Sequence, residues 1–186
     1  AIRVNHPALQ RFWERSAKRA VALSFMARRL PGMSADVAHT YGLFCHVGLP
    51  VLMQSVRGYA GTMVEARART DRSYIETENA NHRTDHAVVG ALTARAWKLA
   101  PAVMAAIRLH HSLESLGSAD TEPEVHTLVA AGLLADFLLA RQAGLSPDPE
   151  WEPFGAAACD WLDVSADDLS HWGEALSESD ALEAFA

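Results

Sequence analysis

The chain has 186 residues, of which 49% are hydrophobic, and a formal net charge of −7 at pH 7. This length and composition are enough for one domain with a buried core, and they exclude intrinsic disorder as the main state. No run of sequence approaches the roughly 20 consecutive apolar residues of a membrane span, so no membrane partner is expected. The two cysteines, Cys45 and Cys159, lie far apart and form no CxxC motif, as is typical of reduced thiols in a cytoplasmic protein.

Charge is distributed unevenly along the chain. Residues 1–108 contain 15 Lys and Arg against 7 Asp and Glu, whereas residues 109–186 contain 1 against 16. Such asymmetry indicates either a basic binding surface or two halves that attract one another. Because the basic residues are spaced apart rather than grouped in runs, the second interpretation is favoured, and a nucleic acid is not an expected partner.

Apolar residues recur at helical spacing through the chain, and no segment alternates as a half-buried strand does. Proline, glycine and N-cap residues mark where each helix begins and ends. Thr84 is the expected N-cap of the helix that carries His86, and the patterns that begin at Ser73 and Ser165 predict capping boxes. Helices are therefore expected at residues 7–30, 35–48, 51–56, 62–69, 74–80, 85–97, 101–111, 123–143 and 153–162, and after residue 165.

A helical hairpin over residues 82–114 is the centre of the chain. If its two helices pack antiparallel, His86 at the start of the first lies beside His110 and His111 at the end of the second. Converging imidazoles suggest a metal or anion site, because neutral imidazole ligates metal near neutral pH; the alternative is that they are polar ends of helices. Adjacent residues of a helix point about 100° apart. His110 and His111 are therefore not expected to share one mononuclear ion, although each can reach a larger site.

Two carboxylates outside the hairpin are also candidates. Asp136 lies in an otherwise apolar helical run, so it must either face solvent or have a partner. Glu78, His82 and His86 are four residues apart and would form one column along a continuous helix. The asparagines around them and the Thr84 cap predict a break in that helix, so this column is a weak signal.

Four segments resemble, in order, those of the HDOD family. FWERSAKRAVALSFMARRL is similar to the helix that opens an HD-type domain, and CHVG stands where that superfamily has HD-x-G. DHAVVGALTARAWKLAPAVMAAIRLHH resembles the HDOD signature of a His, a Gly, a Trp, a Pro and a terminal His-His pair. HTLVAAGLLADFLLARQAGL is similar to the helix that follows it. The resemblance covers about residues 9–145 and implies an all-α, HD-domain-like helical bundle.

The resemblance implies a remnant metal or anion site with two departures from the superfamily pattern. His46 matches the histidine of the HD pair, and Val47 stands where its aspartate is expected. Arg15 stands where the first helix usually offers a histidine. The other matching residues are His86, His110, His111 and Asp136.

Val47 and Arg15 argue against an enzyme. In HD hydrolases the aspartate of the pair coordinates metal and bridges two ions, whose repulsion needs an anionic ligand between them. Valine offers no lone pair, and an arginine in the ligand shell repels a cation. We therefore expect no catalytic residue, no tightly bound metal and no cofactor beyond a single weakly bound divalent ion. Arg15 can instead supply positive charge for a phosphate or carboxylate, so a small anionic ligand is a further candidate.

The prolines after residue 146 predict a boundary. Residues 1–146 are expected to form the HDOD or HD-like core, without the family's usual N-terminal helical subdomain. Residues 147–186 are expected to form an acidic helical extension packed on that core, with Trp161 and Trp172 buried. Because the sequence does not begin with Met, we expect it to be part of a longer protein.

Three functions are compatible with these observations. The leading one is a non-catalytic signal-transduction module of HDOD type, with a regulatory or scaffold role, in the cytoplasm of a bacterium and with another signalling protein as its partner. It is favoured because HDOD domains belong to bacterial signalling proteins and generally lack demonstrated catalysis. The first alternative is a metal-dependent HD-type phosphohydrolase or phosphodiesterase with a reduced site of His46, His86, His110 and Asp136. The second is a regulatory module that binds an anionic nucleotide through Arg15 and the histidines without turnover.

Overall fold

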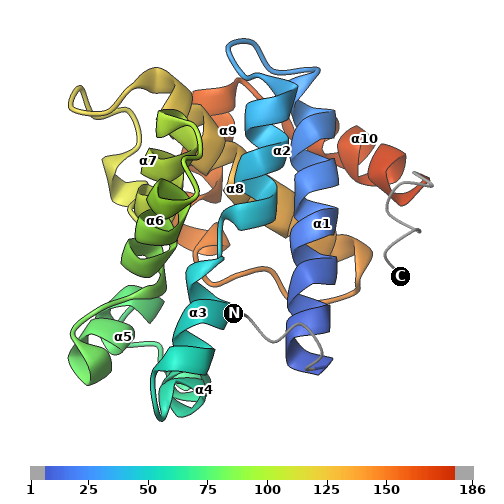
Figure 1. The fold of residues 1–186 in the computed structure, drawn as a ribbon. Coiled ribbons are helices and arrows are strands. Elements are labelled where there is room, and N and C mark those ends of the chain that lie inside the picture. Colours follow the sequence, from blue (N-terminus) through green and yellow to red (C-terminus); the bar gives the residue numbers. More distant parts are fainter. Residues whose placement is uncertain (1–6, 179–186) are drawn as a thin grey trace.

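Every regular element in the computed structural model is a helix, in the part of the chain that it describes, residues 7–178 (Figure 1). The prediction of an all-α fold is thereby confirmed. The helices are α1 (Pro7–Ala27), α2 (Ala35–Phe44), α3 (Gly48–Ser55), α4 (Tyr59–Ala68), α5 (Tyr74–His82), α6 (His86–Ala96), α7 (Pro101–Leu109), the 3-10 helix η1 (Leu113–Ser115), α8 (Pro123–Gln142), α9 (Trp151–Leu162) and α10 (Ala166–Ser177).

The long helix α8 lies at the centre of the bundle, with α1, α7, α9 and α10 packed around it (Figure 1). Its residues are buried on almost all sides between Val125 and Leu138, as is typical of a helix that is hydrophobic all round. With 20 residues and a mean hydropathy of 1.4 in its most apolar window, α8 is also long and apolar enough to cross a membrane. The expectation that no segment approaches a membrane span is therefore wrong. Here α8 is a core helix, because 61% of that window is buried against its neighbours.

The first helix packs closely along α2. A Cβ atom added to Gly42 of α2 would lie 2.7 Å from the Cα atom of Ala20, so the two backbones are nearly in contact. The buried face of α1 has helical spacing and includes Ser16, Ala20 and Leu23, together with one charged residue, Arg19. A charge on this face must have a partner within the bundle.

A second close approach joins α3 to α6. A Cβ atom added to Gly48 would lie 2.0 Å from the carbonyl oxygen of His86 and 2.8 Å from the backbone nitrogen of Gly90, so only glycine fits there. His46 lies two residues before Gly48, in the turn between α2 and α3. The crossing of α3 and α6 therefore brings His46 beside His86.

The helix expected at residues 35–48 ends earlier, at Phe44, and the helix expected at residues 51–56 begins earlier, at Gly48. A turn at residues 45–47 separates α2 from α3 and contains His46. Pro50 lies in the first turn of α3, where its missing N–H removes no intrahelical hydrogen bond.

The helix caps agree with the sequence pattern at two places and differ at one. The capping boxes at Ser73 and Ser165 are both present. The N-cap of α6 is Asp85 rather than Thr84, because the N–H of Val88 donates to Asp85 Oδ1 at 2.8 Å. This shift of one residue makes His86 the first residue of α6.

Helices α9 and α10 pack on α8, and their apolar residues belong to the same core cluster as those of α8. Trp172 is buried as expected, with 8% of its surface exposed, but Trp161 is 37% exposed and the expectation for it is wrong. Trp161 lies at the edge of the bundle, where its indole N–H donates to Thr127 Oγ1 at 3.1 Å.

Attraction between the basic and acidic halves is not visible as a network of surface ion pairs. Among the described residues, the arginine–carboxylate pair that joins the halves is Arg19 with Asp136. Apolar contacts, rather than charge, hold α9 and α10 against the bundle.

We predict that Gly48→Ala destabilises the protein by about 3 kcal/mol, because the new methyl group must force α3 and α6 apart. Gly61→Ala is the matched control, since a Cβ there meets nothing within 4 Å. Alanine is a better helix former than glycine, so this variant should be neutral or up to about 1 kcal/mol more stable. Urea unfolding measures both values. Equal effects of the two substitutions would contradict the close crossing.

Candidate functional site

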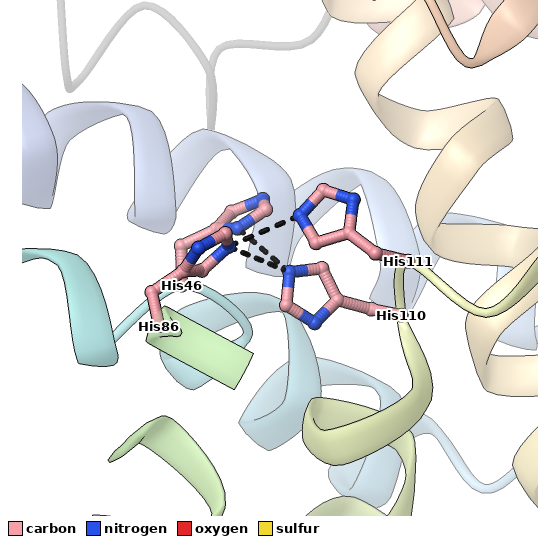
Figure 2. Close-up of side chains that lie close together, drawn as sticks. All are labelled: His46, His86, His110 and His111. Atoms are coloured by element: carbon pink, nitrogen blue, oxygen red, sulfur yellow. Dashed lines mark hydrogen bonds between the residues drawn. The ribbon is translucent and has the colours of Figure 1, made fainter. Parts of the chain in front are cut away.

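Four histidine side chains meet inside the bundle (Figure 2). His46 comes from the turn before α3, His86 begins α6, and His110 and His111 directly follow α7. One ring nitrogen of each histidine lies within 4.8 Å of the other three. His86 Nε2 is 3.2 Å from His110 Nε2 and 3.0 Å from His111 Nε2, and His110 Nε2 is 3.1 Å from His46 Nδ1. The structure thus brings together four of the six residues that the sequence suggested.

His110 and His111 do point into the same site, so the argument that they could not share one ion is wrong. That argument assumed a continuous helix, but α7 ends at Leu109. His110 is the C-cap and His111 lies in the turn beyond it, which leaves the two ring centroids only 4.1 Å apart. Outside a regular helix the angle of about 100° between neighbouring side chains no longer applies.

The orientation of three rings is fixed by hydrogen bonds that point away from the cluster. Nδ1 of His86 lies 2.8 Å from Glu78 Oε1, and Nδ1 of His111 lies 2.7 Å from Glu150 Oε1. Nδ1 of His110 lies 2.7 Å from the carbonyl oxygen of Ile107. Each of these oxygens is an acceptor, so each Nδ1 carries the proton and donates. A neutral ring then presents the lone pair of its Nε2 to the cluster.

Converging lone pairs repel one another unless a positive charge lies between them. The nitrogens of His86 and His110 that face each other at 3.2 Å have no proton to share, because both rings have their proton on the far side. In a tetrahedral zinc site with Zn–N bonds of about 2.0–2.1 Å, the nitrogens lie about 3.3 Å apart. Three of the six nitrogen–nitrogen distances in the cluster, 3.0–3.2 Å, are within a few tenths of an ångström of that value, and all six are within 4.8 Å. One metal ion is therefore a candidate occupant of the cluster.

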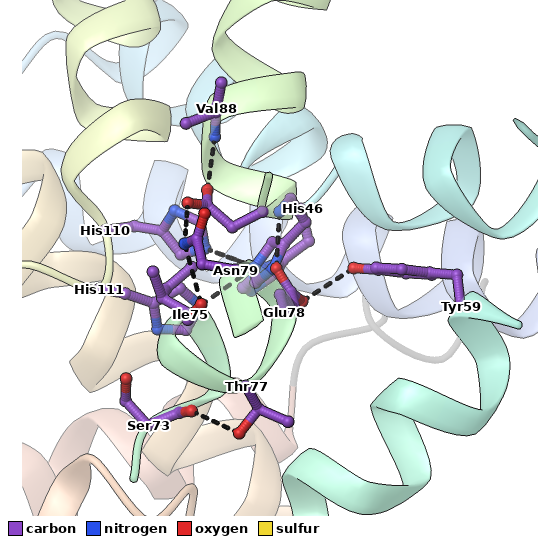
Figure 3. A network of polar contacts seen from close by, with 12 residues as sticks. His46, Tyr59, Ser73, Ile75, Thr77, Glu78, Asn79, Val88, His110 and His111 are labelled. Atoms are coloured by element: carbon purple, nitrogen blue, oxygen red, sulfur yellow. Dashed lines mark hydrogen bonds and ion pairs between the residues drawn. The ribbon is translucent and has the colours of Figure 1, made fainter. Parts of the chain in front are cut away.

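Glu78 supports the cluster from behind (Figure 3). Its side chain is fully buried and accepts hydrogen bonds from the Tyr59 hydroxyl at 2.8 Å and from the backbone N–H of His86 at 2.7 Å, in addition to His86 Nδ1. The four-residue spacing of Glu78, His82 and His86 in the sequence indicated that Glu78 and His86 could lie close together. The break occurs at Arg83, which has a left-handed backbone with φ of 58°. Glu78 meets His86 across the break, whereas His82 bonds with Thr62 instead.

Arg19, rather than Arg15, is the arginine of the site. Nε and Nη2 of Arg19 donate to Asp136 Oδ1 at 2.9 and 2.6 Å, and Asp136 Oδ2 lies 3.8 Å from His46 Nε2. Arg15, one turn earlier, is exposed. The sequence could have indicated that Arg19 is buried, because Arg19 lies three residues after Ser16 and therefore on the same apolar face of α1. The guanidinium therefore supplies the positive charge that the Asp136 carboxylate needs inside the bundle.

Burial and neighbouring charges set the protonation of the cluster. Burial and a nearby guanidinium lower the pKa of His46 to about 3. Burial also lowers the pKa of His86, and burial with the neighbouring rings lowers the pKa of His110 far below its usual value. Burial alone would lower the pKa of His111, but the hydrogen bond with Glu150 and its charge raise it overall. A proton in the cluster therefore resides on His111, from which Nε2 can donate to His86.

The part of the chain that contains the first seven helices matches a known protein family. The model of the HDOD domain matches residues 2–113. The chain belongs to the HDOD family. The matched region contains all four histidines of the cluster and ends before α8, so Asp136 and Glu150 lie outside it.

Solved structures of similar fold support an HD-like helical bundle, as expected. A candidate phosphohydrolase from Shewanella amazonensis SB2B has a TM-score of 0.69 at 20% identity, over 95% of this chain and 62% of that one. The MmoQ response regulator from Methylococcus capsulatus str. Bath has a TM-score of 0.62 at 18% identity, over 87% and 60%. A candidate signal transduction protein from Marinobacter aquaeolei VT8 has a TM-score of 0.68 at 17% identity, over 93% and 38%. This HDOD chain thus spans less than two thirds of each neighbour, and no curated protein matches its sequence.

We predict that the metal-free HDOD chain loses stability as the pH falls from 7 to 5. The folded-state pKa values of His46, His86 and His110 are below the unfolded value of about 6.5, so in this range the unfolded chain binds more protons. His111 acts in the opposite direction, because its raised pKa favours folding below about pH 6.5. Because three histidines have lowered pKa values and one has a raised pKa value, the net effect is a loss of stability as the pH falls.

Thermal unfolding midpoints at pH 5, 6 and 7 with EDTA measure this pH dependence. His46→Asn should weaken it, whereas His39→Asn, at an exposed position, should not. A midpoint that rises as the pH falls would contradict a neutral cluster.

We predict that Arg19→Ala costs about 3 kcal/mol of stability, since it leaves the Asp136 carboxylate without its partner. This is the lower end of the range for buried pairs, because the Asp136 side chain is 30% exposed. Arg15→Ala, one turn earlier on an exposed part of α1, should change stability by no more than about 0.5 kcal/mol. Chemical unfolding of the two variants compares them directly; similar losses would show that Arg19 has no special role.

Proposed function

We propose that this HDOD domain is a non-catalytic signalling module that binds one divalent transition-metal ion through His46, His86, His110 and His111. The observation that carries the proposal is the convergence of four ring nitrogens within 4.8 Å. With three Nδ1 protons committed to outward hydrogen bonds, the inward-facing lone pairs form a ready-made ligand set.

The number of protein ligands argues for binding without hydrolysis. Structural zinc sites have four protein ligands, whereas catalytic sites have three and keep one position open for water or substrate. If all four histidines bound one ion in a tetrahedral shell, no position would remain at which that ion could activate a water molecule. A water without a metal keeps a pKa near 15.7 and is a poor nucleophile at neutral pH.

Among the described residues, the group of side chains that could hold a metal ion is the cluster of four histidines, and a second ion is not expected. Val47 is fully buried and offers no donor atom where the bridging aspartate of an HD pair would be. The Asp136 carboxylate is already neutralised by Arg19 at 2.6 Å. The anion-binding alternative relied on Arg15, which is exposed. Arg19, the arginine beside the cluster, already makes two hydrogen bonds to Asp136 and so is not free to clamp a phosphate in its place.

The ligand chemistry favours some ions over others. Four neutral imidazoles suit zinc, copper, nickel and iron, whereas magnesium, calcium and manganese prefer carboxylate, carbonyl and water oxygens. The carboxylates of Glu78 and Glu150, each behind one histidine, add negative charge that favours a cation.

Membership of the HDOD family supports the signalling role, and two structural neighbours are described as a response regulator and a candidate signal transduction protein. We propose that the domain works in the cytoplasm of a bacterium and that its output is a contact with another signalling protein. The metal ion would then fix the conformation presented to that partner.

A phosphohydrolase is the second candidate. Its support is the candidate phosphohydrolase among the structural neighbours and the position of His46, whose side chain is 18% exposed, against 3% for His86 and 10% for His111. If His46 left a bound ion, three histidines and one open position would remain, which is the ligand set of several catalytic zinc sites.

We predict one zinc ion per chain after loading and desalting, and no turnover of cyclic dinucleotides or a generic phosphodiester, even with added manganese. His86→Ala combined with His110→Ala should abolish zinc retention, whereas His39→Ala, at an exposed site, should retain it. Elemental analysis measures the ion, and product release measures hydrolysis. Two ions per chain, or manganese-dependent hydrolysis that His86→Ala removes, would overturn the module and favour the phosphohydrolase.

A further inference from the structure

One acceptor for the histidine cluster comes from outside the part of the chain that matches the HDOD family. Glu150 lies beyond residues 2–113, immediately before α9, and its Oε1 accepts the hydrogen bond from His111 Nδ1 at 2.7 Å. Glu150 occupies the N-cap position of α9, yet its side chain makes no capping hydrogen bond. The carboxylate is directed to His111 instead of to its own helix.

The docking of α9 fixes the position of this carboxylate. The backbone N–H of Glu150 donates to Asp148 Oδ1 at 3.0 Å, and the N–H of Trp151 donates to the carbonyl oxygen of Asp148 at 2.9 Å. The Trp151 ring stacks on Phe137 of α8, with centroids 3.7 Å apart and planes within 10° of parallel. Glu150 can therefore reach His111 only while the start of α9 is packed on α8.

We propose that Glu150 is a positioning residue for the ion site and that it makes ion binding and docking of the C-terminal helices depend on each other. This inference rests on the proposed ion site. A carboxylate that accepts from Nδ1 of a ligating histidine fixes the tautomer and orientation of the ring and raises its basicity. When His111 binds the ion, it in turn stabilises the conformation in which Glu150 contacts His111. Coupling of this kind is reciprocal, so each event must strengthen the other by the same factor.

The two carboxylates behind the cluster have different roles in this arrangement. Glu78 is held on α5, inside the family-matched region, and Tyr59 fixes it from the other side. Glu150 is carried by the connection between α8 and α9 and is held by docking. Ion occupancy of the HDOD core can therefore be transmitted to α9 and α10 through His111.

The test compares zinc binding by the full chain with Glu150→Ala, Glu150→Gln and Glu152→Ala. Glu152 is an exposed acid on the same helix, so its variant controls for lost charge and helix propensity. Competition with a chromophoric zinc chelator measures affinity. We expect Glu150→Ala to weaken zinc binding about 10- to 100-fold, Glu150→Gln to weaken it less because the amide oxygen still accepts a hydrogen bond, and Glu152→Ala to match the wild type.

Hydrogen exchange with and without zinc supplies the second readout. In the wild type, zinc should slow amide exchange at residues 145–151 and in α9, and Glu150→Ala should abolish that slowing while the protein remains folded by circular dichroism. If the wild type binds zinc but Glu150→Ala binds equally well, or zinc leaves exchange in α9 unchanged, the coupling is overturned and the ion site stands. If the wild type binds no zinc, both the ion site and the coupling are wrong.

Discussion

The outward hydrogen bonds of three histidines determine what this site can hold. Because His86, His110 and His111 each commit the Nδ1 proton to an oxygen outside the cluster, their Nε2 atoms cannot satisfy one another while all three rings are neutral. Buried lone pairs that face each other are costly, and a cation between them removes the cost. A metal ion does this fully, and a proton on His111 does it in part.

The rest of the bundle makes this arrangement possible. The crossing of α3 and α6 at Gly48 brings His46 to His86, and the end of α7 at Leu109 lets two adjacent histidines share one direction. Beside them, Arg19 balances the charge of Asp136 with a fixed guanidinium. An arginine in that place provides a permanent positive charge beside the carboxylate, and it has no lone pair with which to bind a metal ion.

The C-terminal helices are part of the same site rather than an appendage. They share the apolar core of α8, and Glu150, the N-cap residue of α9, supplies the acceptor for His111. All four histidines lie within residues 2–113, the part of the chain that matches the HDOD family, whereas Glu150 lies outside it. Features of this chain beyond the family-matched region thus bear on how the site behaves.

The sequence by itself determined the helices, both serine capping boxes, the convergence of His86 with the end of α7 and the family, because these depend on local spacing and on residues close in the chain. It also indicated that Asp136 needed a partner. Only the tertiary structure decided that the partner is Arg19, since Arg15 and Arg19 are one turn apart and packing selects which of them is buried. Only the tertiary structure placed Glu150 on His111, because no local pattern links residues 39 positions apart whose contact depends on how α9 docks on α8.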